Sequence, residues 1–177
     1  MTERIFIAIG SNIEPELNIP RALKLLSEKV RLFALSTFYS SAPEDSPGSP
    51  PFYNGAAEIT TELEPMDIKW KVLRPIEEVL GRVRTADKNS PRTMDLDLLL
   101  YGNRVIADPR LTLPDPGILD YPFVAIPLAE LAPRLIPPVF PRMSLSQGTA
   151  RFSPNGLIPL KALTAALQEK WTHAKKS

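Results

Sequence analysis

The sequence of 177 residues contains no cysteine and a single histidine, His173. The lack of thiols excludes disulfides and thiolate metal ligands, and one histidine argues against a zinc site. Any metal ion would therefore be held by oxygen ligands. Lysine and arginine number 21 against 20 acidic residues, a net charge of +1, so no global field attracts nucleic acid or a membrane surface.

Long apolar runs are also missing. No stretch approaches the roughly 18 residues that a transmembrane helix needs, and residues 1–4 lack the profile of a signal peptide. We therefore expect a cytoplasmic protein. Glycine is scarce at 8 residues, whereas proline at 20 is about twice as frequent as usual. The prolines cluster at 43–51, 109–127 and 133–141, which indicates stiffened loops.

The apolar pattern predicts an alternating order of strands and helices. Strands are expected at 5–9, 33–39, 56–61 and 93–101, and helices at 20–30 and 64–81. Pro20 suits a first helical turn, whereas Pro75 should kink the second helix. The order β-α-β-β-α-β is typical of the α+β class, as a ferredoxin-like split βαβ sandwich with an antiparallel sheet and helices on one face.

Two further helices are expected at 123–131 and 160–171. We assign residues 1–140 to one domain and residues 141–177 to a C-terminal helical extension packing on it. Leu163, Leu167 and Trp171 would cap the body, with a partner or self-association surface as the alternative. A monomer is the simplest expectation, and a homo-oligomer stays open.

Two aspartates give the clearest chemical signal. Asp95 and Asp97 lie two residues apart in the apolar run 94–100, so in a strand both carboxylates point to one face. Like charges beside a core need a proton or a cation, and Mg²⁺ bound by carboxylates plus substrate phosphates meets that need. An isolated Asp-x-Asp can also cap a turn or pair with lysine.

A basic loop precedes the acidic strand. Between residues 81 and 92 the cations are Arg82, Arg84, Lys88 and Arg92, and the only anion is Asp87. Arginine pairs bidentately with phosphate oxygens, so loop and strand together suit polyphosphate chemistry. Taken alone, such a loop is usually just solvated. Residues 10–12 are more simply a turn than a phosphate cradle.

Four segments together resemble a known family. They are PRTMDLDLLLYG (91–102), GRVR (81–84), AIGSN (8–12) and FYN-x-A-A (52–57). With them, the chain from about residue 5 to 133 resembles the 6-hydroxymethyl-7,8-dihydropterin pyrophosphokinases of folate synthesis. The resemblance implies a ferredoxin-like α+β fold and transfer of pyrophosphate from ATP to the hydroxymethyl group of the pterin, releasing AMP.

The resemblance also implies residue roles. Asp95 and Asp97 would bind two Mg²⁺ ions, and Arg82 and Arg92 would grip the triphosphate and steady the transition state. Asp97 is also the nearest candidate proton acceptor, since His173 lies in the tail. Further ATP contacts would come from Glu77, Arg84, Arg110 and Thr112, with Arg84 on a mobile loop.

For the pterin, the resemblance implies Asn54 as the reader of the amide edge, between the rings of Phe52 and Phe123. Ser41, Ala42 and Pro43 would line the pocket through backbone groups. Ordinary core packing is the alternative for both rings. Loops 41–51 and 84–92 would act as lids that exclude water.

Three positions depart from the family pattern. Asp115-Pro116 stands where many members have histidine-tyrosine, Asn89 where a tryptophan is common, and Tyr121 where an arginine is common. These changes bear on ATP binding and lid closure, since Asp115 would repel phosphate unless a cation or water intervenes.

Two other functions fit some of these features. One is a non-catalytic ferredoxin-like module that binds nucleotide or RNA, which would read bases with aromatics on an open sheet. The other is a Mg²⁺-dependent phosphohydrolase, which uses Asp95 and Asp97 but leaves Asn54 and Phe52 without a task. The expected partners are small molecules, with no nucleic acid and no membrane.

Overall fold

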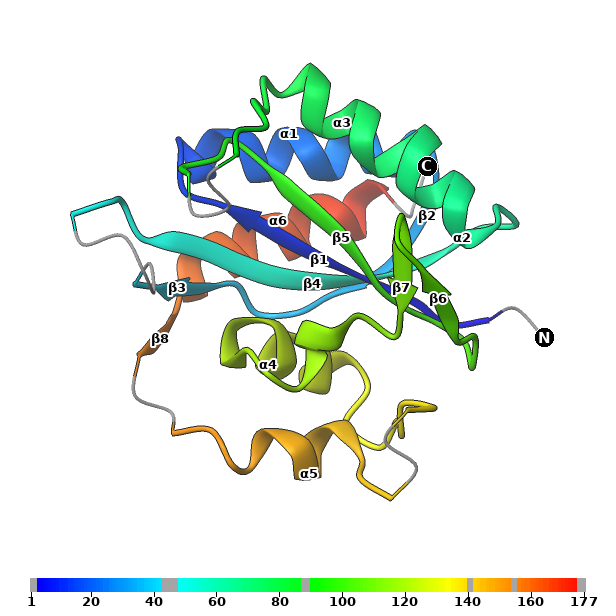
Figure 1. Cartoon of the computed structure of the whole chain (residues 1–177). Coiled ribbons are helices and arrows are strands. Elements are labelled where there is room, and N and C mark those ends of the chain that lie inside the picture. The colour runs from blue at the N-terminus through cyan, green and yellow to red at the C-terminus, as the bar shows by residue number, and fades with distance from the viewer. Residues whose placement is uncertain (1–2, 43–47, 87–89, 140–141, 154–155, 175–177) are drawn as a thin grey trace.

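A computed structural model describes residues 3–42, 48–86, 90–139, 142–153 and 156–174. A six-stranded antiparallel sheet forms the centre, with the order β5-β1-β4-β3-β8 and β2 paired to β4 (Figure 1). The strands are β1 (Ile5–Ser11), β2 (Arg31–Leu35), β3 (Tyr39–Ser41), β4 (Phe52–Thr60), β5 (Asp95–Tyr101) and β8 (Leu157–Pro159), with a separate hairpin of β6 (Ile106–Asp108) and β7 (Leu111–Leu113).

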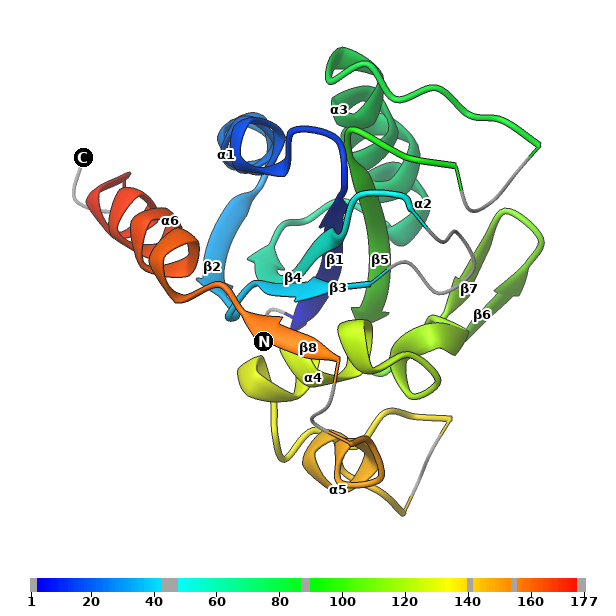
Figure 2. The ribbon, with the colours of Figure 1, turned by 90° about the vertical axis from the view of Figure 1, so that its left-hand side faces the viewer.

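Helices cover both faces of this sheet (Figure 2). On one face lie α1 (Pro15–Ser27), the helix running from α2 (Pro65–Asp67) through η1 (Ile68–Leu73) to α3 (Arg74–Val79), and α6 (Lys161–Ala174). On the other lie the 3₁₀ turn η2 (Pro116–Ile118), α4 (Pro122–Leu131) and α5 (Leu145–Thr149). The α+β antiparallel architecture is confirmed, but the prediction of helices on one face is wrong.

Both faces of the sheet carry apolar residues, which explains the two helical layers. Ile5, Ile7 and Ile9 belong to the larger core under α1 and α3, whereas Phe6 and Leu100 belong to a second core with α4 and α5. Alternation along β1 sends successive side chains to opposite faces. A sheet with apolar residues on both faces must be covered twice.

The first helix begins before its predicted start. Pro15 occupies the first turn of α1, after Glu14 in a left-handed conformation with φ 43°, and Pro20 lies inside the helix. The prediction that Pro20 opens the helix is therefore wrong. Pro20 cannot donate a backbone hydrogen bond, which destabilises the helix. The burial of apolar residues on one helix face, including Ile19 and Leu26, offsets that loss.

The second helix contains a π-helical turn. The Arg74 N–H donates to the carbonyl of Lys69, five residues earlier. Pro75 has no N–H for the carbonyl of Lys71 and its ring would crowd that group, and a wider turn relieves both problems. The disturbance expected at Pro75 thus takes the form of a π turn.

The C-terminal segment packs on the main body. Strand β8 pairs with β3, and Leu167 of α6 is buried in the larger core. Leu163 and Trp171 pack against that core. Among the residues described, no helix is long and apolar enough to span a membrane.

Candidate active site

The two aspartates lie side by side on one face of β5, as their spacing predicts. Asp95 is opposite Gly10 and Asp97 is opposite Ala8 of the neighbouring strand β1. On its other side, Gly10 is paired with Asn54 of β4, so Asp95, Gly10 and Asn54 are neighbours across three adjacent strands. Because glycine has no side chain, the floor between Asn54 and Asp95 stays open; a Cβ on Gly10 would lie 2.9 Å from Asn54 Oδ1.

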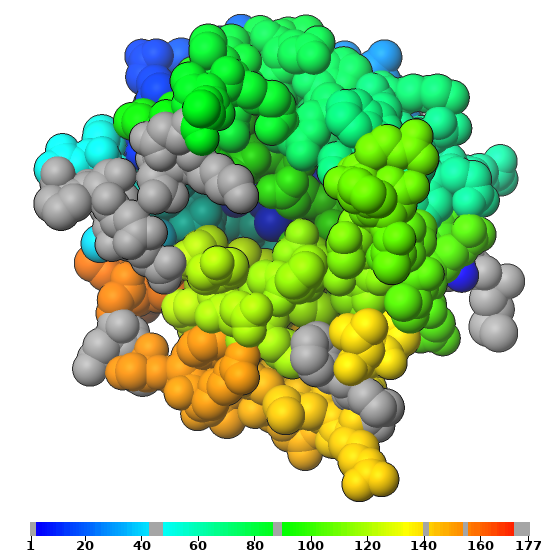
Figure 3. Space-filling view, in the orientation of Figure 1, coloured from blue at the N-terminus to red at the C-terminus, as the bar shows by residue number. Residues whose placement is uncertain are grey.

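Figure 3 shows the molecule hollowed over β1, β4 and β5, so that the sheet forms the floor of an open site. Two cavities meet there at Asp97. One, of about 290 Å³, is lined by Arg74, Arg82, Val83, Arg84, Thr85, Ser90, Arg92, Asp95 and Asp97. The other, of about 240 Å³, is lined by Lys69, Leu96, Asp97, Leu98, Pro109, Arg110, Leu111, Thr112, Asp115 and Pro116. The first is strongly cationic, and the second combines apolar side chains with the charged groups of Lys69, Asp97, Arg110 and Asp115.

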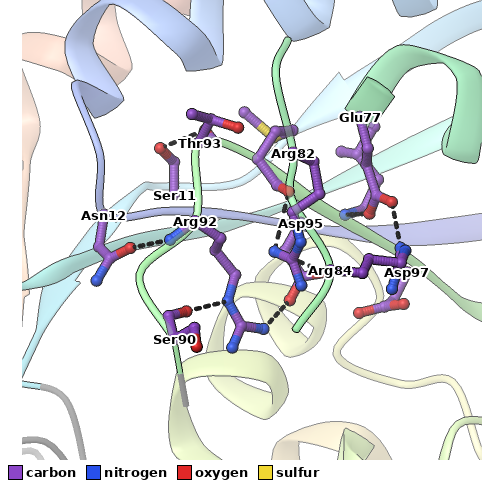
Figure 4. Close-up of polar contacts among 12 residues, drawn as sticks. Ser11, Asn12, Glu77, Arg82, Arg84, Ser90, Arg92, Thr93, Asp95 and Asp97 are labelled. Carbon is purple, nitrogen blue, oxygen red and sulfur yellow. Dashed lines mark hydrogen bonds and ion pairs between the residues drawn. The ribbon is translucent and has the colours of Figure 1, made fainter. Parts of the chain in front are cut away.

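Two arginines from the basic segment contact Asp95 (Figure 4). Arg92 Nη1 donates to Asp95 Oδ2 at 2.7 Å, and Arg82 Nη1 lies 3.8 Å from Oδ1. Arg82 also donates to the Met94 carbonyl at 3.2 Å, and its Nε is buried without a hydrogen-bond partner in the described chain. Burial lowers the pKa of Arg82, which is nonetheless charged at any physiological pH. Phosphate oxygens would satisfy its remaining donors.

The negative charge of Asp97 is less compensated than that of Asp95. Its nearest cation is Arg74, with Nη2 3.5 Å from Oδ1. Desolvation, followed by the charge of Asp95, raises the pKa of Asp97 to about 7, although its side chain keeps 46% of its exposure. A carboxylate that ionises with such difficulty beside another is one that a divalent cation would stabilise.

Glu77 of α3 holds two arginines of the site in place. Its carboxylate, 1% exposed, accepts hydrogen bonds from Arg74, Arg84 and the Leu96 N–H, the last at 2.8 Å. Strand β5 is the edge of the sheet, so Leu96 needs this acceptor. The sequence assigned Glu77 to ATP, whereas here the carboxylate contacts protein donors.

The turn after β1 fixes the loop that carries Arg92, a role that the sequence did not indicate. Asn12 Oδ1 accepts from the Arg92 N–H at 2.7 Å, and the Arg92 carbonyl accepts from the Asn12 N–H at 3.1 Å. Ser11 Oγ donates to the Thr93 carbonyl at 2.7 Å (Figure 4). Residues 11 and 12 thus form a clamp that holds residues 92 and 93 by hydrogen bonds. An ordinary turn would expose Ser11 and Asn12, whereas here both are buried. A short sequence motif does not reveal that burial.

Of the predicted pterin residues, Ser41 and Asn54 are brought together. Asn54 Nδ2 donates to Ser41 Oγ at 2.9 Å, and both side chains are buried. Arg92 lies over the Phe52 ring, 5.6 Å from its centroid. Phe123 stacks on Tyr121 with ring centroids 5.3 Å apart. Ala42 is exposed, and Pro43 lies outside the described residues.

The remaining nucleotide-side predictions fall on the second cavity. Arg110 and Thr112 line it, and the Arg110 guanidinium pairs with Asp108 at 2.9 Å on the β6–β7 turn. Asp115, one of the departures from the family pattern, accepts from the Gly117 N–H at 2.7 Å and caps η2. Burial raises the pKa of its carboxyl. Asn89 lies outside the described residues.

The donor set suits a magnesium ion shared with a substrate. No group of three or more acidic or histidine side chains gathers in the part of the chain that is described, so these residues alone offer no complete metal cage. Two adjacent carboxylates beside an arginine-lined cavity are what Mg²⁺ needs when phosphates complete its coordination. The arrangement is typical of one class of protein, which handles a metal-bound polyphosphate on an antiparallel sheet.

Comparison with known proteins places the chain within that class. Residues 6–133 match the family model of 7,8-dihydro-6-hydroxymethylpterin-pyrophosphokinase (HPPK). The chain is 41% identical over 138 residues to the 2-amino-4-hydroxy-6-hydroxymethyldihydropteridine pyrophosphokinase of Pseudomonas aeruginosa, covering 76% of this chain and 84% of that protein. It is 40% identical over 136 residues to the enzyme of the same name from Haemophilus influenzae, covering 75% and 84%.

The chain therefore belongs to the HPPK family, and the resemblance seen in its motifs is confirmed. A solved HPPK-DHPS structure in complex with substrates shares the fold, with a TM-score of 0.55 over 98% of this chain and 45% of that one at 11% identity. The Dictyostelium discoideum folic acid synthesis protein is 33% identical over 135 residues, covering 76% of this chain and only 20% of that protein.

Proposed function

We propose that this protein transfers the pyrophosphoryl group of ATP to 6-hydroxymethyl-7,8-dihydropterin, giving the pterin diphosphate and AMP in folate biosynthesis. The pterin hydroxymethyl oxygen forms a bond to the β-phosphorus, and the bond from that phosphorus to the oxygen bridging the α-phosphate breaks. The observation that carries this proposal is the arrangement of Asp95 and Asp97. Both line the cationic cavity, Asp97 also lines the second cavity, and only Gly10 of β1 separates Asp95 from Asn54 across the sheet.

The two cavities suit the two ends of ATP. The triphosphate would lie in the cationic cavity, where Arg82 and Arg92 hold the charge that develops as the bond breaks. The base and ribose would lie in the second cavity beside Arg110 and Thr112. Arg84 would close on the nucleotide, and the Glu77 carboxylate, which accepts a hydrogen bond from Arg84, would keep the Arg84 guanidinium close to the phosphates.

We propose that Asp95 and Asp97 hold two Mg²⁺ ions together with the phosphates. When bound, these ions neutralise phosphate charge and lower the pKa of the attacking hydroxyl. Asp97 is the candidate proton acceptor in this proposal; catalysis would otherwise rest on positioning and fixed charge.

The pterin would bind against β3 and β4. Asn54 supplies the donor and acceptor that match its amide edge, with Ser41 as the partner that orients the amide. Phe52 and Phe123 would stack on its two faces, and Ala42 and Pro43 would line the pocket through backbone groups.

The wider organisation follows the same proposal. Residues 1–140 would form the pyrophosphokinase domain, a ferredoxin-like unit supported by the strand order β5-β1-β4-β2, and residues 141–177 an extension packed on it. We propose a monomer in the cytoplasm, where ATP is supplied. Membership of the HPPK family disfavours both an RNA-binding module and a phosphohydrolase.

The test is an assay of purified protein with ATP, Mg²⁺ and the hydroxymethyl-dihydropterin. We expect AMP and the pterin diphosphate in equal amounts, and no AMP without the pterin. Release of ADP or inorganic phosphate, or AMP formation at the same rate without pterin, would exclude the proposed reaction.

A further inference from the structure

The π turn between α2 and α3 places two cations on one side of Asp97. Lys69 and Arg74 are five residues apart, and the Arg74 N–H closes the turn on the Lys69 carbonyl. In a regular α-helix of about 3.6 residues per turn, residues five apart face different directions. The wider π turn brings them nearly into line. Lys69 and Arg74 thus reach the two cavities that meet at Asp97.

Lys69 lies in the second cavity without an ion-pair partner in the part of the chain that is described. Its ammonium donates to the Arg110 carbonyl and lies 5.6 Å from the centroid of the Trp70 ring. An ammonium has three donors. Burial, followed by the charge of Arg74, lowers the pKa of Lys69, while the charges of Asp97 and Asp115 act in the opposite direction. A partly desolvated lysine aimed into a cavity is suited to an anionic ligand.

Arg74 is held so that one end of its guanidinium stays available. Nη1 donates to both oxygens of Glu77 at 2.7 Å. Nη2 faces the cationic cavity, with Asp97 Oδ1 at 3.5 Å, longer than a good charge-assisted hydrogen bond. Anchoring by a buried carboxylate fixes the plane of the guanidinium, so little side-chain freedom is lost when Nη2 binds a ligand.

We propose that Lys69 and Arg74 bind the phosphates of ATP beside Asp97, where the two cavities meet. Arg74 would reach the triphosphate from the cationic cavity, and Lys69 would reach the end of the triphosphate next to the ribose from the second cavity. This inference rests on the proposed function and adds two ligand-binding residues to it. It also explains how the chain accommodates Asp115: Lys69 supplies, in the same cavity, the positive charge that offsets the repulsion between that carboxylate and phosphate.

The chain offers a matched control two residues further along the same π turn. Lys71 pairs with Asp67 at 2.9 Å and its side chain is 69% exposed. It is a lysine in the same segment that faces solvent instead of the cavity. Lys69→Met and Lys71→Met remove the same charge and leave a similar apolar stem, but only Lys69→Met removes an ammonium from the cavity; Lys71→Met removes an ion pair on the surface.

The experiment is calorimetric titration of each variant with a non-hydrolysable ATP analogue and, separately, with inorganic tripolyphosphate, both with Mg²⁺. We expect Lys69→Met to raise the Kd of both ligands by about tenfold, which corresponds to the loss of one hydrogen bond to a charged group. Lys71→Met should change neither Kd by more than about twofold. Arg74→Gln should have an effect similar to that of Lys69→Met, and Arg74→Lys should restore part of the affinity. Thermal unfolding would check that Arg74→Gln folds, because it leaves Glu77 with less compensation.

The results separate two failures. Normal affinity of Lys69→Met for both ligands, alongside a fully active wild-type protein, would overturn this inference alone. Weaker nucleotide binding with unchanged tripolyphosphate binding would move Lys69 to the ribose or base and refute the assignment to phosphate. If the wild-type protein bound neither ligand, the proposed function itself would fall.

Discussion

Gly10→Ala tests the link between the sheet floor and the recognition of the pterin. The added Cβ would lie 2.9 Å from Asn54 Oδ1 and 3.9 Å from Asp95 Cβ. Carbon–oxygen contacts normally begin near about 3.3 Å, so the Asn54 amide must shift by about 0.4 Å while Asp95 stays in place. The amide cannot shift freely, because it is buried and bonded to Ser41 Oγ at 2.9 Å.

The expected consequence is selective. A misplaced amide leaves part of the pterin edge unpaired, which costs about 1–3 kcal/mol, or roughly a five- to 150-fold increase in KM for the pterin. Overpacking should also lower the free energy of unfolding by about 1–3 kcal/mol. The phosphate-side groups are untouched, so the KM for ATP should stay within about twofold of wild type.

The assay is initial-rate AMP release with each substrate varied in turn, and a double-mutant cycle supplies the control. Asn54→Ala removes the atom that the new methyl group meets. Adding Gly10→Ala to Asn54→Ala should therefore change the KM for pterin little further. An equal rise of the ATP and pterin KM values in Gly10→Ala, or full additivity of the two changes, would refute the reasoning.

Three further perturbations address other parts of the site. Asp95→Asn and Asp97→Asn should each abolish AMP release while circular dichroism stays native, because in the proposed function both carboxylates hold the metal; turnover near wild type in either would remove that residue from the proposed metal site. Glu77→Gln should lower the free energy of unfolding, measured in urea, by on the order of 3 kcal/mol, because it breaks a buried pair with Arg74; an unchanged midpoint would contradict the anchoring role. Asn12→Ala should cost about 1–3 kcal/mol in the same measurement and lower kcat more than it raises KM, since the Arg92 N–H loses its acceptor at 2.7 Å; wild-type kcat would exclude the clamp.

The sequence predicted the acidic strand well because its signal is local. Period-two alternation in residues 95–98, followed by an apolar run to residue 101, decides both the strand and the common face of the two aspartates. The predicted strand 33–39, by contrast, divides into β2 and β3. The Phe38 N–H donates to Thr164 Oγ1, and the Phe38 carbonyl accepts from the Leu160 N–H. The strand is interrupted where the C-terminal segment takes its backbone groups, and partners so distant in sequence leave no trace in a local pattern.

The site shows the same division. Asp95, Asp97, Arg82 and Arg92 were predicted from their neighbours in sequence, and the structure places all four around one cavity. Lys69 and Arg74 were not predicted, because regular helical periodicity does not align them; only the π turn does. Glu77 was predicted in the right region, but its contacts depend on the edge position of β5, which follows from the topology of the whole sheet.

The ion pairs of the site explain why metal and nucleotide should require each other. Arg92 contacts Asp95 and Arg74 lies near Asp97. If the carboxylates bound a metal ion alone, both arginines would lose their partner charge, which costs electrostatic energy. A triphosphate without a cation would in turn meet two carboxylates. When both arrive, the arginines can turn from carboxylate to phosphate oxygens and no charge is left unpaired. Each ligand then raises the affinity for the other by the same factor. An exchange of partners among charges that are already in place demands little rearrangement of the sheet that carries them.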